Sequence, residues 1–371
     1  MTMRRDHEAG AATTLDATRI DDLRIAAVRP LLSPAILEDE LPVSPAVEQT
    51  VRQTRHEIAE ILQGRDDRLL VIIGPCSIHD FDQAIEYGDR LRGMREALSA
   101  DLLIVMRVYF EKPRTTVGWK GFINDPNLDG SFRMNDGLRL ARRLLIQLAQ
   151  LGVPAGTEFL DLLTPQFFSD LIAWAAIGAR TTESQTHRQL ASGLSCPVGF
   201  KNGTDGGVKV AVDALQAAGA PHSFMGMTKM GAAAIFETRG NDQCHVILRG
   251  GPVPNYHAAD VDSTCAALTR AGLPPRVMID CSHANASKQF ARQTLVAQDI
   301  AQQIAAGDRR IIGAMIESHL NEGRQDAIAG QPLAHGISIT DPCLGWPASQ
   351  AALISLAQAV GMRRRRSVAA H

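Results

Sequence analysis

LLVIIG, residues 69–74, is an apolar run that ends at a glycine, and it is the first of eight such runs along the chain. The other seven are short and mainly apolar as well, and they occupy residues 102–108, 154–159, 176–179, 197–202, 245–250, 276–283 and 311–318. Runs that are apolar at successive positions, rather than at every second one, are typical of parallel strands buried on both faces. The sequence therefore predicts eight buried parallel strands.

The segments between these runs have the periodicity of amphipathic helices. After the first run, apolar residues recur at intervals of three and four, at Tyr87, Leu91, Met94 and Leu98. A similar pattern over 138–148 is followed by Gly152, and the segment 51–64 ends on a glycine that can close a helix. Helices therefore alternate with the predicted strands.

Eight strands that alternate with helices predict an α/β fold, the (β/α)8 TIM barrel. About 240 residues separate Cys76 from Glu317, close to the usual barrel size of about 250 residues. An open doubly wound sheet is the alternative, but GxGxxG, its dinucleotide-binding motif, is missing after the first run. We predict an N-terminal extension over 1–65 and a catalytic barrel over 66–371.

One stretch, HSFMGMTKMGAAAIFETRGND at 222–242, is too irregular for a barrel helix. It predicts a β-hairpin inserted into the barrel at about 221–243. The residues RGND, at 239–242, are of the kind that forms turns, and we expect them to be the turn of this hairpin.

The bulk composition excludes several classes of protein. The chain has 371 residues, 45% of them hydrophobic, and a formal net charge of −2, which argues against a general nucleic-acid-binding protein. No run of about 18 apolar residues is present, so no membrane span is expected. Because the N-terminus lacks the apolar segment of a secretory signal and the six cysteines are scattered singly, we expect a cytoplasmic protein with reduced thiols.

In a TIM barrel, chemistry takes place at the C-terminal ends of the strands. The predicted strand ends carry polar or reactive residues: Cys76, Arg107, Glu158, Arg180, Lys201, Arg249, His283 and Glu317. Taken singly, an arginine in such a place more often forms a salt bridge at the rim, and a cysteine more often packs in the core. Together they predict a site that binds anions and a cation, because unpaired charges near the barrel axis are costly.

Six positive side chains belong to this set or to the loop after the second strand: Arg107, Lys112, Arg114, Arg180, Lys201 and Arg249. Two or three such groups, with backbone N–H donors, normally satisfy one phosphate, which arginine binds in a bidentate manner and lysine binds as a point charge. Six positive charges therefore predict at least two anionic groups, either two phosphates or a phosphate and a carboxylate.

Four residues that lie far apart in the sequence are candidate metal ligands: Cys76, His283, Glu317 and Asp341. No zinc-finger spacing connects them, and they become neighbours only if the barrel closes. A mixture of sulfur, nitrogen and oxygen donors suits a borderline divalent ion such as Mn, Fe, Co, Zn or Cu. His79 and His319 lie near the same strand ends and are alternative ligands.

Eight motifs resemble those of a known family: GPCSIHD (74–80), MRVYFEKPRTTVGWKG (106–121), IGARTTESQTHR (177–188), SCPVGFKNGTDG (195–206), ILRGG (247–251), MIDCSHANASKQ (278–289), IESHL (316–320) and SITDPCLGW (338–346). Together they closely resemble the type I 3-deoxy-D-arabino-heptulosonate 7-phosphate (DAHP) synthases, from about residue 18 to about residue 360. The KPRTT and RTTES blocks are the most specific. The resemblance implies the first step of the shikimate pathway, in which phosphoenolpyruvate condenses with D-erythrose 4-phosphate and inorganic phosphate is released.

The resemblance also implies roles for individual residues. The positions that match the phosphoenolpyruvate site are Arg107, Ala179, Arg180, Lys201 and Arg249. Those that match the erythrose 4-phosphate side are Lys112, Pro113, Arg114 and Thr115. Lys112 is placed to reach both substrates, and Glu158 or Lys201 is expected to manage proton transfer, so these three form the expected catalytic set. The four candidate metal ligands match the metal ligands of the family.

A control site is implied as well. In this family the N-terminal extension and the inserted hairpin bind an aromatic amino acid as a feedback inhibitor, and the matching positions are Asp22, Pro165, Ser195, Phe224 and Gly226. Family members with serine at the position of Gly226 are sensitive to phenylalanine, and those with glycine to tyrosine. We therefore expect inhibition by tyrosine rather than phenylalanine. The family also implies a homodimer or homotetramer, with the extension among its contacts.

Three alternatives remain, one of them a closely related synthase and two from other classes of protein. Another phosphoenolpyruvate aldol-type synthase, such as the one that makes octulosonate phosphate, shares the barrel but lacks the KPRTTVGWKG block. A non-catalytic sensor of phosphorylated sugars would have no reason to keep a full set of metal ligands. A metal-dependent hydrolase barrel is a third option, but its HxH motif after the first strand is absent.

Overall fold

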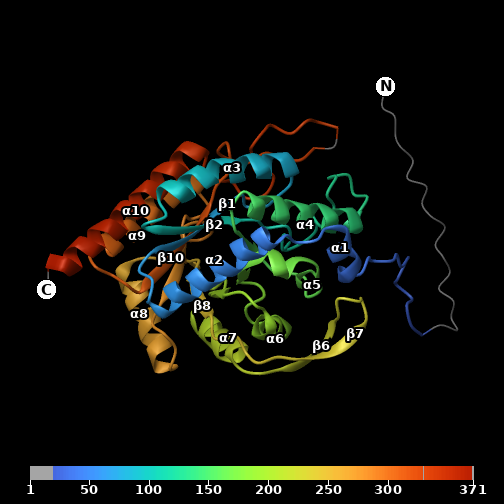
Figure 1. The fold of residues 1–371 in the computed structure, drawn as a ribbon, viewed down its shortest axis with the longest axis horizontal. Helices are drawn as coiled ribbons and strands as arrows, with labels where there is room; N and C mark the ends of the chain where they lie inside the picture. Colours follow the sequence, from blue (N-terminus) through green and yellow to red (C-terminus); the bar gives the residue numbers. More distant parts are fainter. Residues whose placement is uncertain (1–19, 329, 370–371) are drawn as a thin grey trace.

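The computed structural model describes residues 20–328 and 330–369, and these form a closed barrel of eight parallel strands with helices around it (Figure 1). The strands follow one another around the barrel in the order β1–β10–β9–β8–β5–β4–β3–β2. Their bounds are β1 Leu69–Gly74, β2 Leu102–Arg107, β3 Ala155–Glu158, β4 Ile172–Ile177, β5 Val198–Lys201, β8 Cys244–Leu248, β9 Val277–Asp280 and β10 Ile311–Glu317. The predicted (β/α)8 barrel is confirmed.

One strand lies elsewhere than predicted. Strand β4, Ile172–Ile177, begins four residues before the expected run at 176–179 and ends inside that run, and all of its residues are buried. It ends where it does because the chain turns at Gly178, whose carbonyl oxygen accepts hydrogen bonds from the backbone N–H groups of Thr181 and Thr182, both at 2.9 Å. The apolar stretch 171–179 continues past this turn, so composition alone did not mark the end of the strand.

Helices cover the outside of the barrel, and the expected alternation with the strands is present. The long ones are α3 Phe81–Ala97, α4 Met134–Gln150, α6 Gln185–Gly193, α7 Lys209–Gly219, α8 Ala258–Arg270, α9 Gln293–Ala305 and α10 Trp346–Ala369. The connection between β3 and β4 holds only the short helix α5, Pro165–Phe168, and a 3-10 turn at Ser169–Leu171. Another 3-10 turn, Phe290–Arg292, leads into α9.

Helix α2, Pro45–Gln63, precedes the first strand and begins and ends as its sequence indicates. Ser44 caps its N-terminus by accepting a hydrogen bond from the backbone N–H of Val47, and proline occupies the first helical position. Gly64 ends it with φ at +74°, a left-handed conformation that glycine adopts without strain. The predicted helix over 51–64 is therefore the C-terminal part of a longer one, which begins at Pro45.

Helix α2 closes one end of the barrel interior. Alternate residues of a strand face inward, as Leu70 and Ile72 of β1 do, and the inward-facing residues form a core cluster of their own. Ile58, Ile61 and Leu62 of α2 belong to this interior cluster rather than to the larger one between the barrel and its outer helices. The helix thus fills the barrel end opposite to the one where chemistry is expected.

Hydrogen bonds attach α2 to the N-terminal ends of the strands. Arg55 donates from Nε to the carbonyl oxygen of Ile172, the first residue of β4, at 2.9 Å. Arg276, directly before β9, donates to the carbonyl oxygen of Leu62 at the end of the helix. The last helix of the predicted extension 1–65 is therefore part of the barrel core.

The inserted hairpin consists of β6, Ser223–Met227, and β7, Ala233–Glu237, which pair in antiparallel register and lie outside the barrel (Figure 1). Its turn lies between these strands, where Thr228 N–H donates to the carbonyl oxygen of Ala232 at 2.8 Å. The expected turn at 239–242 is therefore wrong, because those residues follow β7. The left-handed position that the true turn needs is supplied earlier, by Gly231 with φ at +82°.

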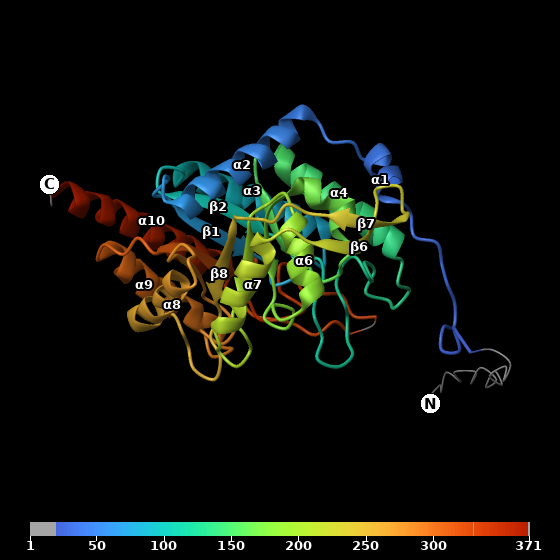
Figure 2. The same cartoon turned by 90° about the horizontal axis from the view of Figure 1, so that it is seen from below.

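Helix α1, Pro34–Glu40, lies beside the hairpin (Figure 2). The Lys229 side chain in the hairpin turn pairs with Glu38 of α1 at 2.6 Å, and it also donates to the carbonyl oxygen of Gln166 in α5. These contacts join the hairpin, α1 and α5. No helix in the described part of the chain is long and apolar enough to cross a membrane.

We predict that Ile58→Ala destabilises the protein by about 2–5 kcal/mol, because it removes a fully buried side chain from the closed end of the barrel. Ile36→Ala is the matched control, since Ile36 in α1 is 52% exposed. Urea unfolding followed by circular dichroism measures both free energies of unfolding. Equal losses for the two variants would contradict the closing role of α2.

Candidate active site

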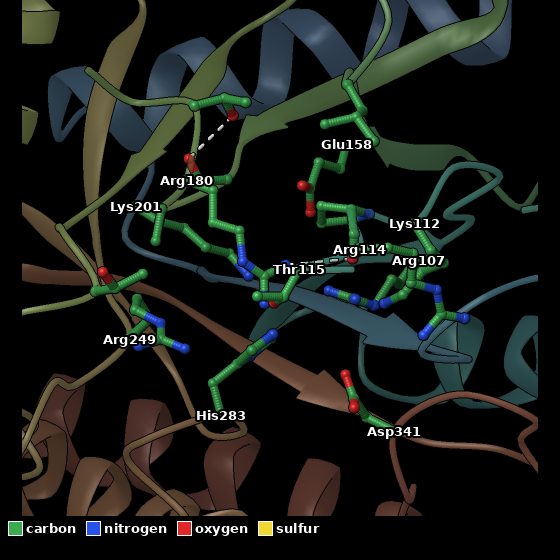
Figure 3. A pocket seen from close by; sticks show the side chains of 16 residues that line it. Arg107, Lys112, Arg114, Thr115, Glu158, Arg180, Lys201, Arg249, His283 and Asp341 are labelled. Atoms are coloured by element: carbon green, nitrogen blue, oxygen red, sulfur yellow. Dashed lines mark hydrogen bonds between the residues drawn. The ribbon is translucent and has the colours of Figure 1, made fainter. Parts of the chain in front are cut away.

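A cavity of about 210 Å³ lies at the C-terminal ends of the strands (Figure 3). The nine predicted substrate-binding residues all line it: Arg107, Lys112, Pro113, Arg114, Thr115, Ala179, Arg180, Lys201 and Arg249. Glu158, His283 and Asp341 line the same cavity. The wall is completed by residues that the sequence analysis did not single out, namely Leu160, Gly178, Thr181 and Thr204.

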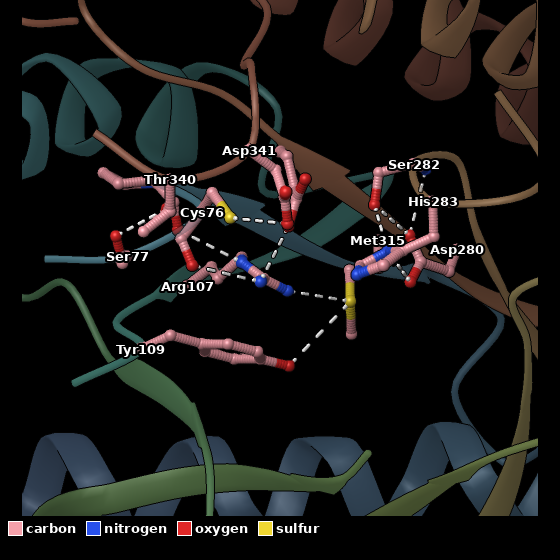
Figure 4. Close-up of polar contacts among 12 residues, drawn as sticks. Cys76, Ser77, Arg107, Tyr109, Asp280, Ser282, His283, Met315, Thr340 and Asp341 are labelled. Carbon is pink, nitrogen blue, oxygen red and sulfur yellow. Dashed lines mark hydrogen bonds and ion pairs between the residues drawn. The ribbon is translucent and has the colours of Figure 1, made fainter. Parts of the chain in front are cut away.

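Arg107, at the end of β2, is only 1% exposed, and protein groups surround its guanidinium (Figure 4). Nη2 donates to Glu317 Oε1 at 2.9 Å and to the carbonyl oxygen of Cys76 at 3.3 Å, and Nε donates to the carbonyl oxygen of Pro75 at 3.1 Å. The guanidinium also lies 3.4 Å from the centre of the Tyr109 ring, a cation–π contact. Arg107 therefore holds Glu317 in place as well as lining the cavity.

Lys112 connects the cationic cavity to the candidate metal ligands. Its Nζ donates to Cys76 Sγ at 3.1 Å and to the carbonyl oxygen of the same residue at 3.3 Å. Burial acts to lower the pKa of Lys112, but the nearby Cys76 and Glu317 outweigh it and raise that pKa above its ordinary value. The ammonium group therefore stays charged in a buried position.

Three arginines face the cavity without an acidic partner. In the described part of the chain, none of Arg114, Arg180 and Arg249 forms an ion pair; the first two donate to backbone carbonyl oxygens, those of Trp119 at 2.7 Å and Pro113 at 3.3 Å. Burial lowers the pKa of Arg249, and the charge of Arg180 acts in the same direction. Positive groups gathered without counter-charges are suited to bind an anionic ligand.

Three donor groups converge beside the cavity. Cys76 Sγ and one carboxylate oxygen each of Glu317 and Asp341 all lie within 4.8 Å of one another. The Cys76 thiol donates to Asp341 Oδ2 at 3.4 Å (Figure 4). Cys76 and Glu317 meet because β1 pairs with β10, in a register that places Gly74 opposite Glu317.

The chemistry of this cluster fits a divalent metal ion. The pKa of the Cys76 thiol is raised to about 11, chiefly by burial; the charge of Glu317 acts in the same direction, and that of Lys112 opposes it. A thiolate and two carboxylates repel one another when all are ionised, and a divalent cation removes that repulsion. A sulfur and two oxygen donors suit the borderline ions that the sequence analysis named.

His283, the fourth predicted ligand, is not part of this three-residue group. It lies in the loop after β9, with its ring extending into the cavity (Figure 3). Its Nδ1 is 2.9 Å from Asp280 Oδ2 and 2.6 Å from Ser282 Oγ, so Nε2 is the nitrogen available to a metal. The alternative ligands His79 and His319 lie outside the group too, with their ring centroids 5.8 Å apart.

Asp280, the last residue of β9, is a site residue that the sequence analysis missed. Its carboxylate is fully buried, lies 3.0 Å from Lys201 Nζ, contacts His283 and accepts a hydrogen bond from the Ser282 hydroxyl at 2.6 Å. Burial acts to raise the pKa of Asp280, but Lys201 and His283 hold it well below its usual range. In the sequence, Asp280 is an acid within the apolar run 276–283, but His283, three residues later, was the predicted site residue of that strand end.

Glu158 faces the cavity from the end of β3 (Figure 3). Its carboxylate lies against Gly178, where a Cβ atom would be 2.5 Å from Glu158 Oε1. Glycine at that position therefore leaves room for the acid. Lys201, the other expected proton-transfer group, lines the same cavity and is positioned by Asp280.

A second, larger hollow of about 1210 Å³ lies between the hairpin and helices α5 and α6, and we call it the groove. Pro165, Ser195, Phe224 and Gly226, four of the five predicted effector residues, line it. Asp22 does not: it is exposed, in the segment that precedes α1. The rings of Phe224 and Phe236 stack with centroids 6.0 Å apart and give the groove an aromatic wall.

Comparisons with known proteins show what this chain is similar to in sequence and in fold. The chain is 59% identical over 344 residues to "Phospho-2-dehydro-3-deoxyheptonate aldolase, Phe-sensitive" of Escherichia coli K12, a match that covers 93% of this chain and 98% of the relative. It is 54% identical over 345 residues to the Trp-sensitive protein of the same strain, covering 93% and 99%. The solved structure of phospho-2-dehydro-3-deoxyheptonate aldolase from Francisella tularensis SCHU S4 matches with a TM-score of 0.90 and 51% identity, covering 91% of this chain and 99% of that one. Residues 42–353 match the DAHP synthetase I family, and the chain belongs to that family.

Proposed function

We propose that this chain is a DAHP synthase, which condenses phosphoenolpyruvate with D-erythrose 4-phosphate to give 3-deoxy-D-arabino-heptulosonate 7-phosphate and inorganic phosphate, the first step of the shikimate pathway. One observation carries the proposal. A single cavity holds three arginines that form no ion pair with any residue that the structure describes, and Lys112 links it to a cluster of one thiol and two carboxylates. Family membership and the names of the relatives support the same reaction.

The substrates bring two phosphates and one carboxylate into the cavity, and we divide the cations between them. Phosphoenolpyruvate is assigned to residues at or just after the strand ends, Arg107, Ala179, Arg180, Lys201 and Arg249. The phosphate of erythrose 4-phosphate is assigned to the more exposed loop, with Pro113, Arg114 and Thr115. Lys112 lies between the two and contacts Cys76, so it is placed to reach both substrates.

The reaction joins C3 of phosphoenolpyruvate to the aldehyde carbon of erythrose 4-phosphate. The cations bring two mutually repelling anions together, and holding them in reacting geometry lowers the barrier by up to roughly 7–11 kcal/mol. Positive charge develops at C2, water adds there, and the bond from C2 to the phosphate oxygen breaks to release inorganic phosphate. We assign the proton transfers to Glu158 and Lys201, which line the cavity.

DAHP synthases of this family are generally metal-dependent. We propose that Cys76, His283, Glu317 and Asp341 hold one divalent ion, which is Mn, Fe, Co, Zn or Cu. When bound, the metal supplies a Lewis acid that polarises the aldehyde oxygen. Asp280 positions the His283 ring for this role, since it holds Nδ1 at 2.9 Å.

We also propose a cytoplasmic location and a homodimer or homotetramer. All six cysteines are free thiols, which suits a reducing compartment. Apolar side chains of the segment before α1 and of the hairpin are largely solvent-exposed: Ile20 at 98%, Val28 at 87% and Met225 at 90%. We expect subunit contacts to cover these side chains, and we assign the regulatory and subunit-contact role to residues 1–65, with the catalytic barrel over 66–371.

The groove is the proposed feedback site for an aromatic amino acid. Relatives named Phe-sensitive and Trp-sensitive support this class of effector. We propose tyrosine because Gly226 leaves the groove open: a Cβ atom at this position would lie 2.8 Å from the Phe236 ring. Asp22 is assigned to the same site, although it does not line the groove in the single chain.

We predict that the purified protein releases inorganic phosphate from phosphoenolpyruvate and erythrose 4-phosphate. With arabinose 5-phosphate instead, kcat/KM should fall by at least about tenfold, because the loop must accommodate one more carbon. Equal or faster turnover of arabinose 5-phosphate would identify an octulosonate-type synthase. Binding of phosphoenolpyruvate without phosphate release from either sugar would identify a sensor.

Removal of the metal with EDTA should abolish phosphate release, and added divalent metal should restore it. Cys76→Ala should lower both metal content and kcat by more than about 100-fold, because even the partners of metal ligands contribute up to that factor. Cys265→Ala is the matched control, since Cys265 is buried in α8 and its thiol donates to the carbonyl oxygen of Pro275. Full activity of Cys76→Ala after chelation would exclude the proposed ligand set.

Tyrosine should inhibit phosphate release more strongly than phenylalanine or tryptophan. Gly226→Ser should weaken that inhibition, because the added Cβ atom meets the Phe236 ring and narrows the groove. Gly219→Ser is the control, as a Cβ atom there meets nothing within 4 Å. Inhibition of the parent protein by phenylalanine alone would reject tyrosine as the effector.

A further inference from the structure

Glu111 is a buried carboxyl group that the proposed mechanism does not use. It directly precedes Lys112 and is only 4% exposed. Its backbone forms a bridge with Gly121, and Lys112 N–H donates to the carbonyl oxygen of Lys120 at 2.9 Å. These contacts close the base of the loop 112–120, so Glu111 stands at the root of the loop that carries the substrate-binding residues Pro113, Arg114 and Thr115.

The Glu111 side chain points away from this loop, toward the segment that follows β3. The Thr164 hydroxyl donates to Glu111 Oε2 at 3.0 Å. The backbone groups of Leu160 and Asp161 also face the carboxyl group and act to lower its pKa. Polar groups from residues 160–164 thus surround one buried side chain.

Residues 160–166, which we call the wall segment, separate the catalytic cavity from the groove. Leu160 lines both hollows. Asp161, Pro165 and Gln166 line the groove. A ligand that displaces the wall segment from the groove side therefore displaces the polar groups that surround Glu111.

We infer that Glu111 is a positioning residue that couples occupation of the groove to the placement of Lys112. The inference rests on the proposed feedback role of the groove and names the contact through which that role acts. Lys112 is the residue next to Glu111, and its ammonium lies only 3.1 Å from Cys76 Sγ. A shift of about 1 Å at the root of the loop is enough to disturb a reacting geometry of this kind.

The contact works through hydrogen bonds more than through charge. Burial raises the pKa of Glu111 to about 8, and the negative charge of Asp161 acts in the same direction. The carboxyl group is therefore largely protonated at neutral pH. Glu111→Gln keeps a neutral group of the same shape with a carbonyl acceptor, whereas Glu111→Leu keeps the approximate size and leaves the Thr164 hydroxyl without its acceptor.

Thr164 allows the contact to be cut with a smaller change. Thr164→Val keeps the shape of the side chain and removes the hydroxyl that donates to Glu111. Thr164→Ser keeps the hydroxyl and removes a methyl group. Because neither residue touches the substrates in the proposed mechanism, both variants test coupling and not catalysis itself.

The experiment measures phosphate release by the full-length protein against rising concentrations of tyrosine, phenylalanine and tryptophan in turn. For Thr164→Val and Glu111→Leu we expect the concentration that half-inhibits the parent protein to rise at least about fivefold, the lower range of typical allosteric coupling. Thr164→Ser and Glu111→Gln should stay within about twofold of the parent. Without effector, kcat of Thr164→Val should also stay within about twofold of the parent value. A purely structural role of this contact would instead change kcat and stability and leave the sensitivity to the effector unchanged.

The outcomes separate this inference from the proposal on which it rests. If the parent is inhibited, and Thr164→Val and Glu111→Leu are inhibited equally well, the coupling role of Glu111 is overturned and the feedback site stands. If none of the three amino acids inhibits the parent, the feedback proposal fails, and this inference fails with it. If Glu111→Leu does not fold, Thr164→Val decides the question alone, because it only replaces one hydroxyl with a methyl group of similar size.

Discussion

The pairing of strand β1 with strand β10 is the constraint on which the active site depends. It closes the barrel and places Gly74 opposite Glu317, and Ser318 N–H donates to the carbonyl oxygen of Gly74 at 2.9 Å. Cys76 follows two residues later, so its thiol reaches a carboxylate of Asp341 that lies 265 residues further along the chain. At the opposite end, α2 fills the interior with apolar side chains. One closed sheet thus provides both an apolar, packed end of the barrel and a polar end that contains the cavity.

The mouth of the barrel contains two kinds of charged group. Arg107 with Glu317, and Lys201 with Asp280, are buried pairs at 2.9 Å and 3.0 Å that hold one another in position. Such pairs are stable only when hydrogen bonds satisfy both partners, so removing one partner leaves a costly buried charge. The arginines that face the cavity without an acid are the other kind, and they are the groups that an anionic substrate can neutralise. The proposed binding site is therefore supported from below by buried ion pairs, in which the positive and negative charges neutralise each other.

Particular residues show how far the sequence could be interpreted. The apolar runs located seven strands because burial on both faces requires continuous apolar residues, but β4 was misplaced since its run continues beyond the turn at Gly178. The hairpin was expected, yet its turn at 239–242 was wrong because a left-handed glycine earlier in the segment, Gly231, already supplies it. Asp280 escaped notice because a carboxylate at the end of a strand has no distinctive spacing to its partners. All nine substrate-binding candidates line one cavity, whereas Asp22 does not line the groove.

The sequence by itself determined the barrel, the family and the residue types at the strand ends, because periodicity and motif identity are local properties of the chain. Only the tertiary structure decided which charges neutralise one another, which arginines remain without acids, and that His283 is held by Asp280 through Nδ1. It also decided that Glu111, which no motif distinguishes by role, lies between the loop of Lys112 and the wall of the groove. These features depend on distances between segments far apart in the sequence, and such distances exist only once the sheet has closed.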